Sequence, residues 1–403
     1  MADGSPQDPG SGKRPGFSIH TQAVAGEGAA GWAVADAAAG ALERGDDVVS
    51  LCLGDTSFDT PERISDAAIR SLRAGRTHYA PVPGTSDLRR NIAAAQGRFD
   101  GQHWTGDEAV VFGGAQNALF AAIMTVAGPG EEVLFLEPWY ATYEATIRAG
   151  GAIAKPVRPA LDAPVKITET LLVEAITDRT RAILLNSPNN PGGYVLEPRD
   201  VQTVVQVARR FNLWIISDEV YRSTVFDGAF LSPAALPGGR ERTIIVNSLS
   251  KSHAMTGWRV GWTLAPPEAA AHLQNLAQCM LFGSPTFVQD AAAVALEPPG
   301  DAEMAFFADE LRKRRDLMCD RLSAIAPIRF ARPGGGMFCF ADVGATGMSG
   351  TVFAERLFSA EGLAVVPGIA FGPHMGGFIR LSFSGAEATI EDGMARLARF
   401  CGG

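Results

Sequence analysis

The sequence has few of the features that mark nucleic-acid-binding, disulfide-stabilised or membrane-spanning proteins. Its formal net charge is −9, so no excess of cations is present to neutralise phosphate groups. Its five cysteines are scattered and show no CxxC spacing, so neither a disulfide framework nor a zinc site is indicated. No apolar run is long enough to cross a bilayer, and the first residues show no signal-peptide pattern. We therefore expect a cytoplasmic protein that binds no metal, no nucleic acid and no membrane.

The composition is that of a globular protein with a large core. Of the 403 residues, 46% are hydrophobic and 20% are charged, and a chain of this length commonly folds as two domains. Residues 1–16 are polar and rich in glycine and proline, which predicts a disordered tail.

Short apolar runs alternate with helical patterns through the middle of the chain. This alternation predicts an α/β fold with a mostly parallel sheet. Residues 172–176 and 201–211 have helical patterns. The clearest predicted strands are residues 133–136, 182–185, 213–217 and 243–247.

The last quarter of the chain has a different pattern. Residues 309–321 predict a charged helix that leads out of the large domain, and residues 330–342 predict strands joined by tight turns. Residues 379–383 predict another strand. We assign this part, together with the start of the chain, to a smaller α+β domain. The predicted division is a small domain of residues 17–60 and 300–403 and a large domain of residues 61–299.

Each of the four predicted strands in the large domain is followed by residues that can take part in chemistry. In open α/β sheets, ligands bind beyond the carboxyl ends of the strands. In chain order the four strands lead to an aromatic ring, an amide, a carboxylate with a phenol, and a lysine: Tyr140, Asn190, Asp218 with Tyr221, and Lys251. We therefore expect these groups to meet at one edge of the sheet as an active site.

Lys251 is the most informative of these residues. It closely follows the apolar run 243–247 and is flanked by small residues, whereas the other four lysines lie in polar or proline-bearing contexts. Burial lowers the pKa of an ammonium group and frees the amine to form a Schiff base. The alternative is a lysine whose charged end reaches the surface, as most lysines do.

Schiff-base chemistry with pyridoxal phosphate needs further groups around the lysine. Asp218 could face the pyridine nitrogen, or it could cap the next helix. Asn190 and Tyr221 could donate hydrogen bonds to the ring oxygen, although Asn-Asn-Pro-Gly by itself is a turn signal. Tyr140 could stack on the ring, or it could simply pack in the core.

Two groups of residues are candidates for binding anions. Residues 112–116 enter a helix through a glycine pair, so exposed backbone N–H groups could meet a phosphate. Ser248 and Arg259, on either side of the lysine, would add a hydroxyl and a guanidinium. Arg380 lies inside an apolar strand, and a buried arginine requires an anionic partner. That partner could be a substrate carboxylate or an acidic side chain of the protein in an internal salt bridge.

From about residue 49 to its C-terminus the chain resembles the fold-type-I, class I/II aminotransferases. Residues 248–261 are similar throughout to that family's pyridoxal-phosphate attachment motif. Supporting matches are residues 53–61, His78-Tyr79 with Gly84 and Leu88-Arg89, residues 186–192 and residues 217–221. The resemblance implies a mostly parallel seven-stranded sheet between helices in the large domain and a smaller α+β domain. It also implies pyridoxal 5'-phosphate as cofactor, with an amino acid and a 2-oxo acid as substrates.

The resemblance implies a role for each matched position. Lys251 would form the Schiff base and carry protons, and Arg380 would grip the substrate α-carboxylate, with Gly54 and Asn190 close by. Tyr79 would reach the phosphate of the neighbouring subunit, so the working unit would be a homodimer. The other cofactor contacts would be Asp218 at the pyridinium, Asn190 and Tyr221 at the ring oxygen, Tyr140 on the ring face, and Gly114, Ala115, Ser248, Ser250 and Arg259 at the phosphate.

Within the family, residues 247–262, 272–285 and 25–32 are similar to the bacterial arginine–pyruvate transaminases. Thr56-Ser57 replaces the usual Pro-Asp, and residues 81–83 also differ from the expected loop, so the substrate stays open.

The scarcity of basic residues in part of the chain bears on which substrate side chain the site accepts. No arginine or lysine occurs between Arg259 and Arg312, and Ala115 stands where some aspartate-using relatives carry a lysine, so a dicarboxylate substrate is disfavoured. Trp32 and the carboxylates of Glu27, Asp36 and Asp55 are candidate partners for a guanidinium group. Trp32 could instead pack at the domain interface. We favour arginine or a related guanidino amino acid. The alternatives are transamination of a neutral or aromatic amino acid, or β-elimination, decarboxylation or oxidation with the same cofactor.

Overall fold

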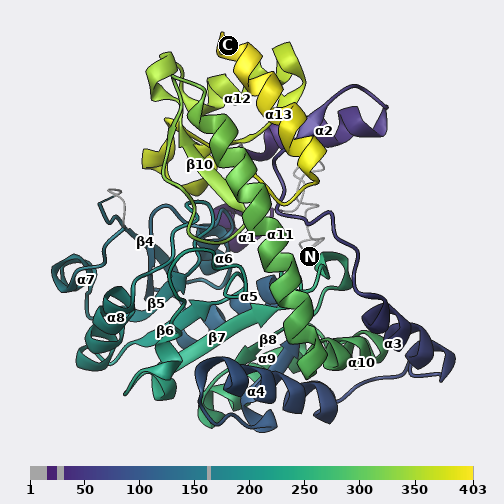
Figure 1. Ribbon diagram of the computed structural model, residues 1–403. Helices are drawn as coiled ribbons and strands as arrows, with labels where there is room; N and C mark the ends of the chain where they lie inside the picture. Colours follow the sequence, from purple (N-terminus) through teal and green to yellow (C-terminus); the bar gives the residue numbers. More distant parts are fainter. Residues whose placement is uncertain (1–15, 25–30, 161–164, 403) are drawn as a thin grey trace, which may run out of the picture.

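The computed structural model describes residues 16–24, 31–160 and 165–402. The predicted tail therefore lies outside the described residues, apart from Gly16. Helices and strands alternate through the middle of the chain, and most strands of the main sheet run in parallel, which confirms the predicted α/β fold class (Figure 1). None of the helices formed by described residues is both long and apolar enough to span a bilayer.

The main sheet has seven strands, and all but one point the same way. Only β8 is antiparallel to its neighbours β2 and β7. The strand order is β2 (Ala109–Phe112), β8 (Gly261–Leu264), β7 (Thr243–Ser248), β6 (Trp214–Asp218), β5 (Thr180–Asn186), β3 (Glu132–Leu136) and β4 (Ile153–Val157). The four strands that were predicted from the sequence are β3, β5, β6 and β7. They are consecutive in the sheet, so their carboxyl ends meet at one edge.

Both faces of this sheet are buried, as a parallel sheet requires. Side chains alternate along each strand: Val133 and Phe135 of β3 belong to one apolar cluster, whereas Leu134 and Leu136 belong to another. The first cluster includes residues of α5 and α9, and the second includes residues of α7 and α8. The helices of this part of the chain are α3 (Glu62–Arg73), α4 (Ser86–Asp100), α5 (Ala115–Val126), α6 (Tyr143–Ala149), α7 (Glu169–Ala175), α8 (Pro198–Arg210), α9 (Pro267–Met280) and α10 (Thr286–Ala295).

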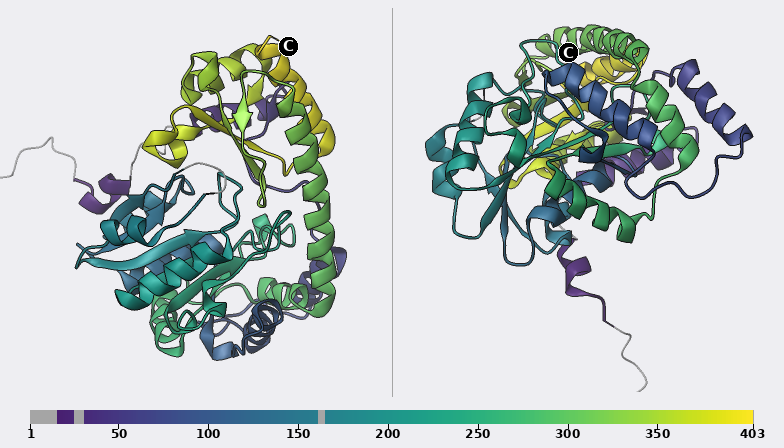
Figure 2. Two further views of the ribbon diagram at one scale, coloured as in Figure 1. Left: turned by 60° about the vertical axis from the view of Figure 1, so that its left-hand side comes forward. Right: turned by 90° about the horizontal axis from the view of Figure 1, so that it is seen from below.

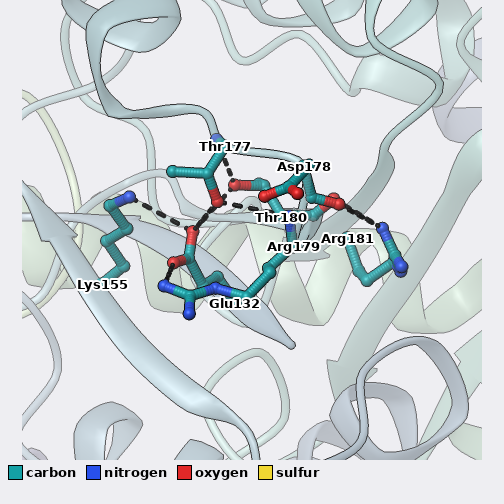
Figure 3. A network of polar contacts seen from close by, with 7 residues as sticks. All are labelled: Glu132, Lys155, Thr177, Asp178, Arg179, Thr180 and Arg181. Carbon is teal, nitrogen blue, oxygen red and sulfur yellow. Dashed lines mark hydrogen bonds and ion pairs between the residues drawn. The ribbon is translucent and has the colours of Figure 1, made fainter. Parts of the chain in front are cut away.

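The amino ends of β3, β4 and β5 are joined by a buried carboxylate. Glu132 accepts hydrogen bonds from Arg179 at 2.8 Å, Thr177 at 2.7 Å, Thr180 at 3.0 Å and Lys155 at 3.2 Å (Figure 3). Burial by itself would raise the pKa of Glu132, but these donors outweigh it and lower the pKa to about 2. This end of the sheet is therefore held by charge and hydrogen bonds, and the opposite edge is left for the site.

The remaining elements form a second apolar core with its own sheets. A four-stranded antiparallel sheet has the order β12, β13, β10, β9, and β1 pairs in parallel with β11. These elements are α2 (Ala33–Glu43), β1 (Val49–Ser50), α11 (Pro298–Ser323), β9 (Arg329–Phe330), β10 (Phe338–Asp342), α12 (Gly350–Glu361), β11 (Leu363–Ala364), β12 (Val366–Pro367), β13 (Phe378–Ser382) and α13 (Glu387–Phe400). Helix α1 (Ile19–Val24) lies instead beside α6 of the large part. The exact division into domains at residues 60 and 300 stays a prediction.

Helix α11 connects the two parts of the molecule. It runs from beside α10 to the region of α12 and α13 (Figures 1 and 2). The sequence predicted its second half, residues 309–321, but the helix begins at Pro298. The prediction was short because Pro-Pro-Gly resembles a loop, whereas proline is well tolerated in the first turn of a helix.

Candidate active site

A cavity of about 160 Å³ lies at the carboxyl ends of the predicted strands. Most residues to which the sequence assigned a cofactor contact line it: Ala115, Tyr140, Asn190, Asp218, Tyr221, Ser248, Ser250, Lys251 and Arg259. Asn186, Gln116, Leu119, Val220 and Thr256 also line it, and no role was assigned to these residues from the sequence. The structure therefore brings together groups that are more than 140 residues apart in the chain.

Lys251 projects from the turn that follows β7. Its surroundings lower the pKa of its ammonium group to about 8, chiefly by burial, and Asp55 opposes that shift. Its Nζ donates a hydrogen bond to the backbone carbonyl of Gly54. Lys251 can therefore lose its proton near neutral pH, as expected for a lysine that forms a Schiff base.

Asp218 ends β6 at the floor of the cavity. Burial raises the pKa of its carboxyl group to about 6, and two hydrogen bonds partly oppose this effect. The phenol of Tyr143 donates to Oδ2 at 2.6 Å, and the backbone N–H of Val220 donates to Oδ1 at 3.3 Å. The alternative role as a helix cap is wrong, because the residues after Asp218 form turns and no helix begins there.

Tyr143 is a site residue that the sequence analysis missed. It begins α6, three residues after Tyr140, and the two rings meet edge to face with centroids 5.6 Å apart. Tyr140 lies before the helix, so no helical periodicity links the two residues, and the second tyrosine so close in sequence was the only available signal. Burial beside Asp218 raises the pKa of Tyr143 well above its ordinary value, so its proton stays in place as a donor.

Asn190 joins the cavity to the buried arginine. Its Nδ2 donates to the phenol oxygen of Tyr221 at 3.4 Å, and its Oδ1 accepts from Nη1 of Arg380 at 3.0 Å. Its backbone N–H donates to Oδ1 of Asn186 at 2.8 Å, which fixes the turn after β5. The Asn-Asn-Pro-Gly segment is therefore both a turn and a source of an inward-facing amide.

Arg380 lies on β13 and is only 1% exposed. Its Nη2 donates to the carbonyl of Cys52 at 2.6 Å, and its guanidinium carbon lies 4.1 Å from the ring centroid of Phe338, 4.7 Å from Phe371 and 5.6 Å from Trp32. Burial lowers its pKa to about 10. Within the described part of the chain it has no acidic partner, and its Nε has no hydrogen bond. The internal salt bridge considered as an alternative is therefore wrong, and the cation can accept an external anion.

The amino end of α5 forms a second anion site. Gly114 precedes the helix with φ of 91°, and no acidic residue occupies the first turn. In the described part of the chain, no side chain caps the N–H groups of this helix. A Cβ at Gly114 would collide with the guanidinium of Arg259, so the glycine allows the cation to approach the backbone. Arg259 donates to the carbonyls of Thr256 at 2.9 Å and Gly113 at 3.4 Å. With the buried hydroxyl groups of Ser248 and Ser250, this arrangement suits a phosphate group.

Some predicted residues do not line the cavity. Tyr79 is 83% exposed and packs edge to face on Phe282. Trp32 is half-buried against the second core, beside Arg380. Among the candidate carboxylates, Asp36 is exposed on α2, Glu27 lies outside the described residues, and Asp55 accepts a hydrogen bond at 2.8 Å from Thr256, a cavity residue.

Comparisons with known proteins show the family to which the chain belongs. The sequence model of the aminotransferase class I and II family matches residues 46–397. The chain is 44% identical to an arginine–pyruvate transaminase of Pseudomonas aeruginosa over 382 residues, which cover 95% of this chain and 97% of that protein. It is 33% identical to an aspartate/prephenate aminotransferase of Thermus thermophilus, with coverage of 89% and 92%.

Solved structures give the same result. An aspartate aminotransferase of Thermus thermophilus with maleate superposes with a TM-score of 0.90 at 31% identity, covering 96% of this chain and all of that one. An N-succinyldiaminopimelate aminotransferase of Mycobacterium tuberculosis superposes with a TM-score of 0.89 at 31% identity, covering 95% and 100%. The family uses pyridoxal phosphate to transfer amino groups between amino acids and 2-oxo acids. The chain belongs to the class I and II aminotransferases.

Proposed function

We propose that this aminotransferase binds pyridoxal 5'-phosphate in the cavity at Lys251 and transfers the α-amino group of arginine, or of a related guanidino amino acid, to a 2-oxo acid such as pyruvate. The observation that carries the cofactor proposal is the convergence of Lys251, Asp218 and an anion site at the start of α5 on one cavity. The observation that carries the substrate proposal is the 44% identity to an arginine–pyruvate transaminase along nearly the whole chain.

The residues of the cavity fit the cofactor part by part. Lys251 would hold it through its amine, Asp218 would keep a proton on the ring nitrogen, and Tyr140 would cover a ring face. Asn190 and Tyr221 would donate to the ring oxygen, and Gly114, Ala115, Ser248, Ser250 and Arg259 would hold the phosphate. When bound, pyridoxal phosphate supplies an electron sink for the charge left when the α-proton is removed.

Two cationic side chains would then divide the work on the substrate. Arg380 would orient the α-carboxylate, since it is buried without an acidic partner in the described part of the chain. Lys251, whose pKa is lowered to about 8, would take the α-proton once the substrate has displaced it. The backbone carbonyl of Gly54 supports this role, because it accepts a hydrogen bond from Nζ of Lys251 and would hold the free amine in place.

The choice of a guanidino substrate rests on charge as well as on similarity. Ala115, where some aspartate-using relatives carry a lysine, offers no cation to a distal carboxylate. Asp55 places a negative charge beside the cavity, because its carboxylate accepts a hydrogen bond from Thr256, which lines the cavity. Several relatives act on aspartate, which makes a dicarboxylate the competing substrate class. A cationic side chain would pair with Asp55, whereas a dicarboxylate would be repelled.

We also propose a homodimer in which Tyr79 of one subunit contacts the phosphate in the other. The support is that Tyr79 is 83% exposed, lies outside the lining of its own cavity, and forms an exposed aromatic pair with Phe282. A cytoplasmic location stays a prediction.

A half-reaction tests the proposed function. Arginine added to the cofactor-loaded protein should change the absorbance of the bound cofactor, and pyruvate should restore it. Release of ammonia with no need for a 2-oxo acid would instead support elimination or oxidation. The Lys251→Ala variant should lose both the covalent absorbance and turnover, and retention of both would contradict the assignment. A screen of amino donors against 2-oxo acids would show whether arginine exceeds aspartate.

A further inference from the structure

The loop of residues 368–375 lies where three parts of the chain meet. It consists of the short helices η7 (Gly368–Phe371) and η8 (Pro373–Met375), which lead from β12 to β13. Phe371 of this loop lies against the guanidinium of Arg380, with 4.7 Å between the guanidinium carbon and the ring centroid. The loop is therefore one wall of the pocket that holds the proposed substrate-binding cation.

Glu137 connects this loop to the main sheet. It follows β3, is only 2% exposed, and stands three residues before Tyr140. Its Oε1 accepts from the backbone N–H of His374 at 3.1 Å, and its Oε2 accepts from Nδ1 of His374 at 2.9 Å. A second hydrogen bond, between backbone groups, joins the N–H of Trp139 to the carbonyl of Phe371 at 3.1 Å. The segment that carries Tyr140 is thus attached to the loop at two points.

Two glycines allow these segments to approach closely. Gly372 has φ of 141°, and a Cβ there would collide with the carboxyl group of Glu137. A Cβ on Gly31 would lie 2.5 Å from Cβ of Ala370, so the segment that leads to Trp32 packs on the same loop. Both contacts require a missing side chain, which indicates that the loop is fitted to the sheet and to the N-terminal segment.

The attachment of the loop to Glu137 depends on the side chain of His374. In residues 16–24, 31–160 and 165–402, His374 provides the only side-chain donor to the carboxylate of Glu137. A buried carboxylate is costly unless it is hydrogen-bonded, so Glu137 favours the arrangement in which the loop stays in contact. The side chain of His374 is itself 52% exposed, so it can be replaced without opening a cavity in the core.

We propose that Glu137 and His374 are positioning residues: they fix the loop of residues 368–375 to the end of β3 and so set the position of Arg380 relative to the cofactor ring. The proposal rests on the proposed function, because it takes Tyr140 as the ring contact and Arg380 as the carboxylate contact. Neither residue touches the reacting atoms. Their loss displaces Phe371 from the face of Arg380 and weakens the binding of any substrate that carries an α-carboxylate.

The test uses three histidine variants of the cofactor-loaded protein. His374→Leu removes the donor, His374→Asn keeps an N–H donor near the position of Nδ1, and His272→Leu alters an exposed histidine on α9 as a control. We expect His374→Leu to raise KM about tenfold for both the best amino donor and the 2-oxo acid acceptor, because small displacements of a positioning group weaken binding strongly. We expect kcat, the cofactor Kd and Tm to stay within about twofold or a few degrees of wild type. His374→Asn should restore most of the KM, and Glu137→Gln should behave as His374→Leu does.

The outcomes separate this proposal from the proposed function. Unchanged KM values in His374→Leu and Glu137→Gln, with a normal wild-type protein, would overturn the positioning role alone. Parallel losses of cofactor affinity, kcat and Tm would also overturn it, since they indicate a general structural role. A wild-type protein that binds no pyridoxal phosphate or transfers no amino group would overturn both.

Discussion

Replacing Tyr143 with phenylalanine removes the phenol that donates to Oδ2 of Asp218 at 2.6 Å. The ring and its packing against Tyr140 are kept, so the change acts on one hydrogen bond. Asp218 then retains only the longer bond from the N–H of Val220 at 3.3 Å. Because burial already raises the pKa of Asp218 to about 6, losing a donor raises it further.

The size of the effect depends on pH. A hydrogen bond to a charged group contributes about 1.5–3 kcal/mol. At pH 6 about half of Asp218 is ionised in the wild type, since its pKa is about 6. If the ionised carboxylate binds the cofactor, the affinity of Tyr143→Phe for pyridoxal phosphate should fall about 7- to 80-fold at pH 6. At pH 9 Asp218 is ionised in both proteins, so the ratio should approach one.

The assay is a titration of cofactor-free protein with pyridoxal phosphate at pH 6, 7.5 and 9, followed by absorbance. The ratio of the variant to the wild type cancels the ionisation of Lys251 and of the cofactor itself. Tyr194→Phe is the matched control, because it removes a buried phenol that has no hydrogen-bond partner among the residues that the structure describes. A ratio that is the same at all three pH values would refute the reasoning, since the loss would then not act through the charge of Asp218.

Three further substitutions test other parts of the structure. Arg380→Gln should lower kcat/KM about 100-fold for amino and 2-oxo acids alike, because about 3 kcal/mol of charge-assisted binding is lost; steady-state kinetics measures this, and an unchanged KM would contradict the carboxylate role. Gly114→Ala should weaken cofactor binding about tenfold or more, because the added Cβ is strained at positive φ and also collides with Arg259. The control Gly75→Ala, at φ of 75° with open space around it, should lower stability alone. Equal cofactor affinity in both variants would contradict this. Glu132→Gln should lower the free energy of unfolding by about 2–3 kcal/mol at pH 7 in urea titrations. Because folding lowers the pKa of Glu132 from 4.5 to about 2, its contribution is complete above pH 4.5 and is lost as the pH falls towards 2, so the difference between the variant and the wild type should fade over that range; a difference that persists at pH 2 would contradict the assignment.

The sequence predicted four adjacent parallel strands of the main sheet, but it did not locate β2 and β8, although both are buried. Strands β3, β5, β6 and β7 are nearly continuous hydrophobic runs, and each was located to within two residues. Strand β4 was missed because it is only partly buried and contains Lys155 and Pro156, and a proline is tolerated there because the strand lies at the edge of the sheet. Apolar patterning thus located the adjacent parallel strands β3, β5, β6 and β7, but neither the short buried strands β2 and β8 nor the edge strand β4.

The parts of the candidate site that consist of distinctive side chains could be predicted from the sequence, and the parts that consist of backbone groups could not. Lys251 and Asp218 were located because a lysine or carboxylate at the end of an apolar strand is unusual. The hydrogen bonds to the carbonyls of Gly54 and Cys52 could not be predicted, because every residue has a carbonyl and only the tertiary fold selects one. Tyr143 was missed for a related reason, since its role depends on where α6 lies relative to β6.

If Arg380 binds the substrate carboxylate as proposed, its lack of an acidic partner among the described residues has a consequence for selectivity. The incoming amino acid and the incoming 2-oxo acid both carry a carboxylate, so one buried guanidinium can attract each reactant of a two-step exchange in turn. In that role the guanidinium would not distinguish groups beyond the α-carbon, and small carboxylates in the medium would compete for it. Discrimination among amino acids must therefore come from side chains elsewhere around the cavity, and these can change without altering the shared anchor.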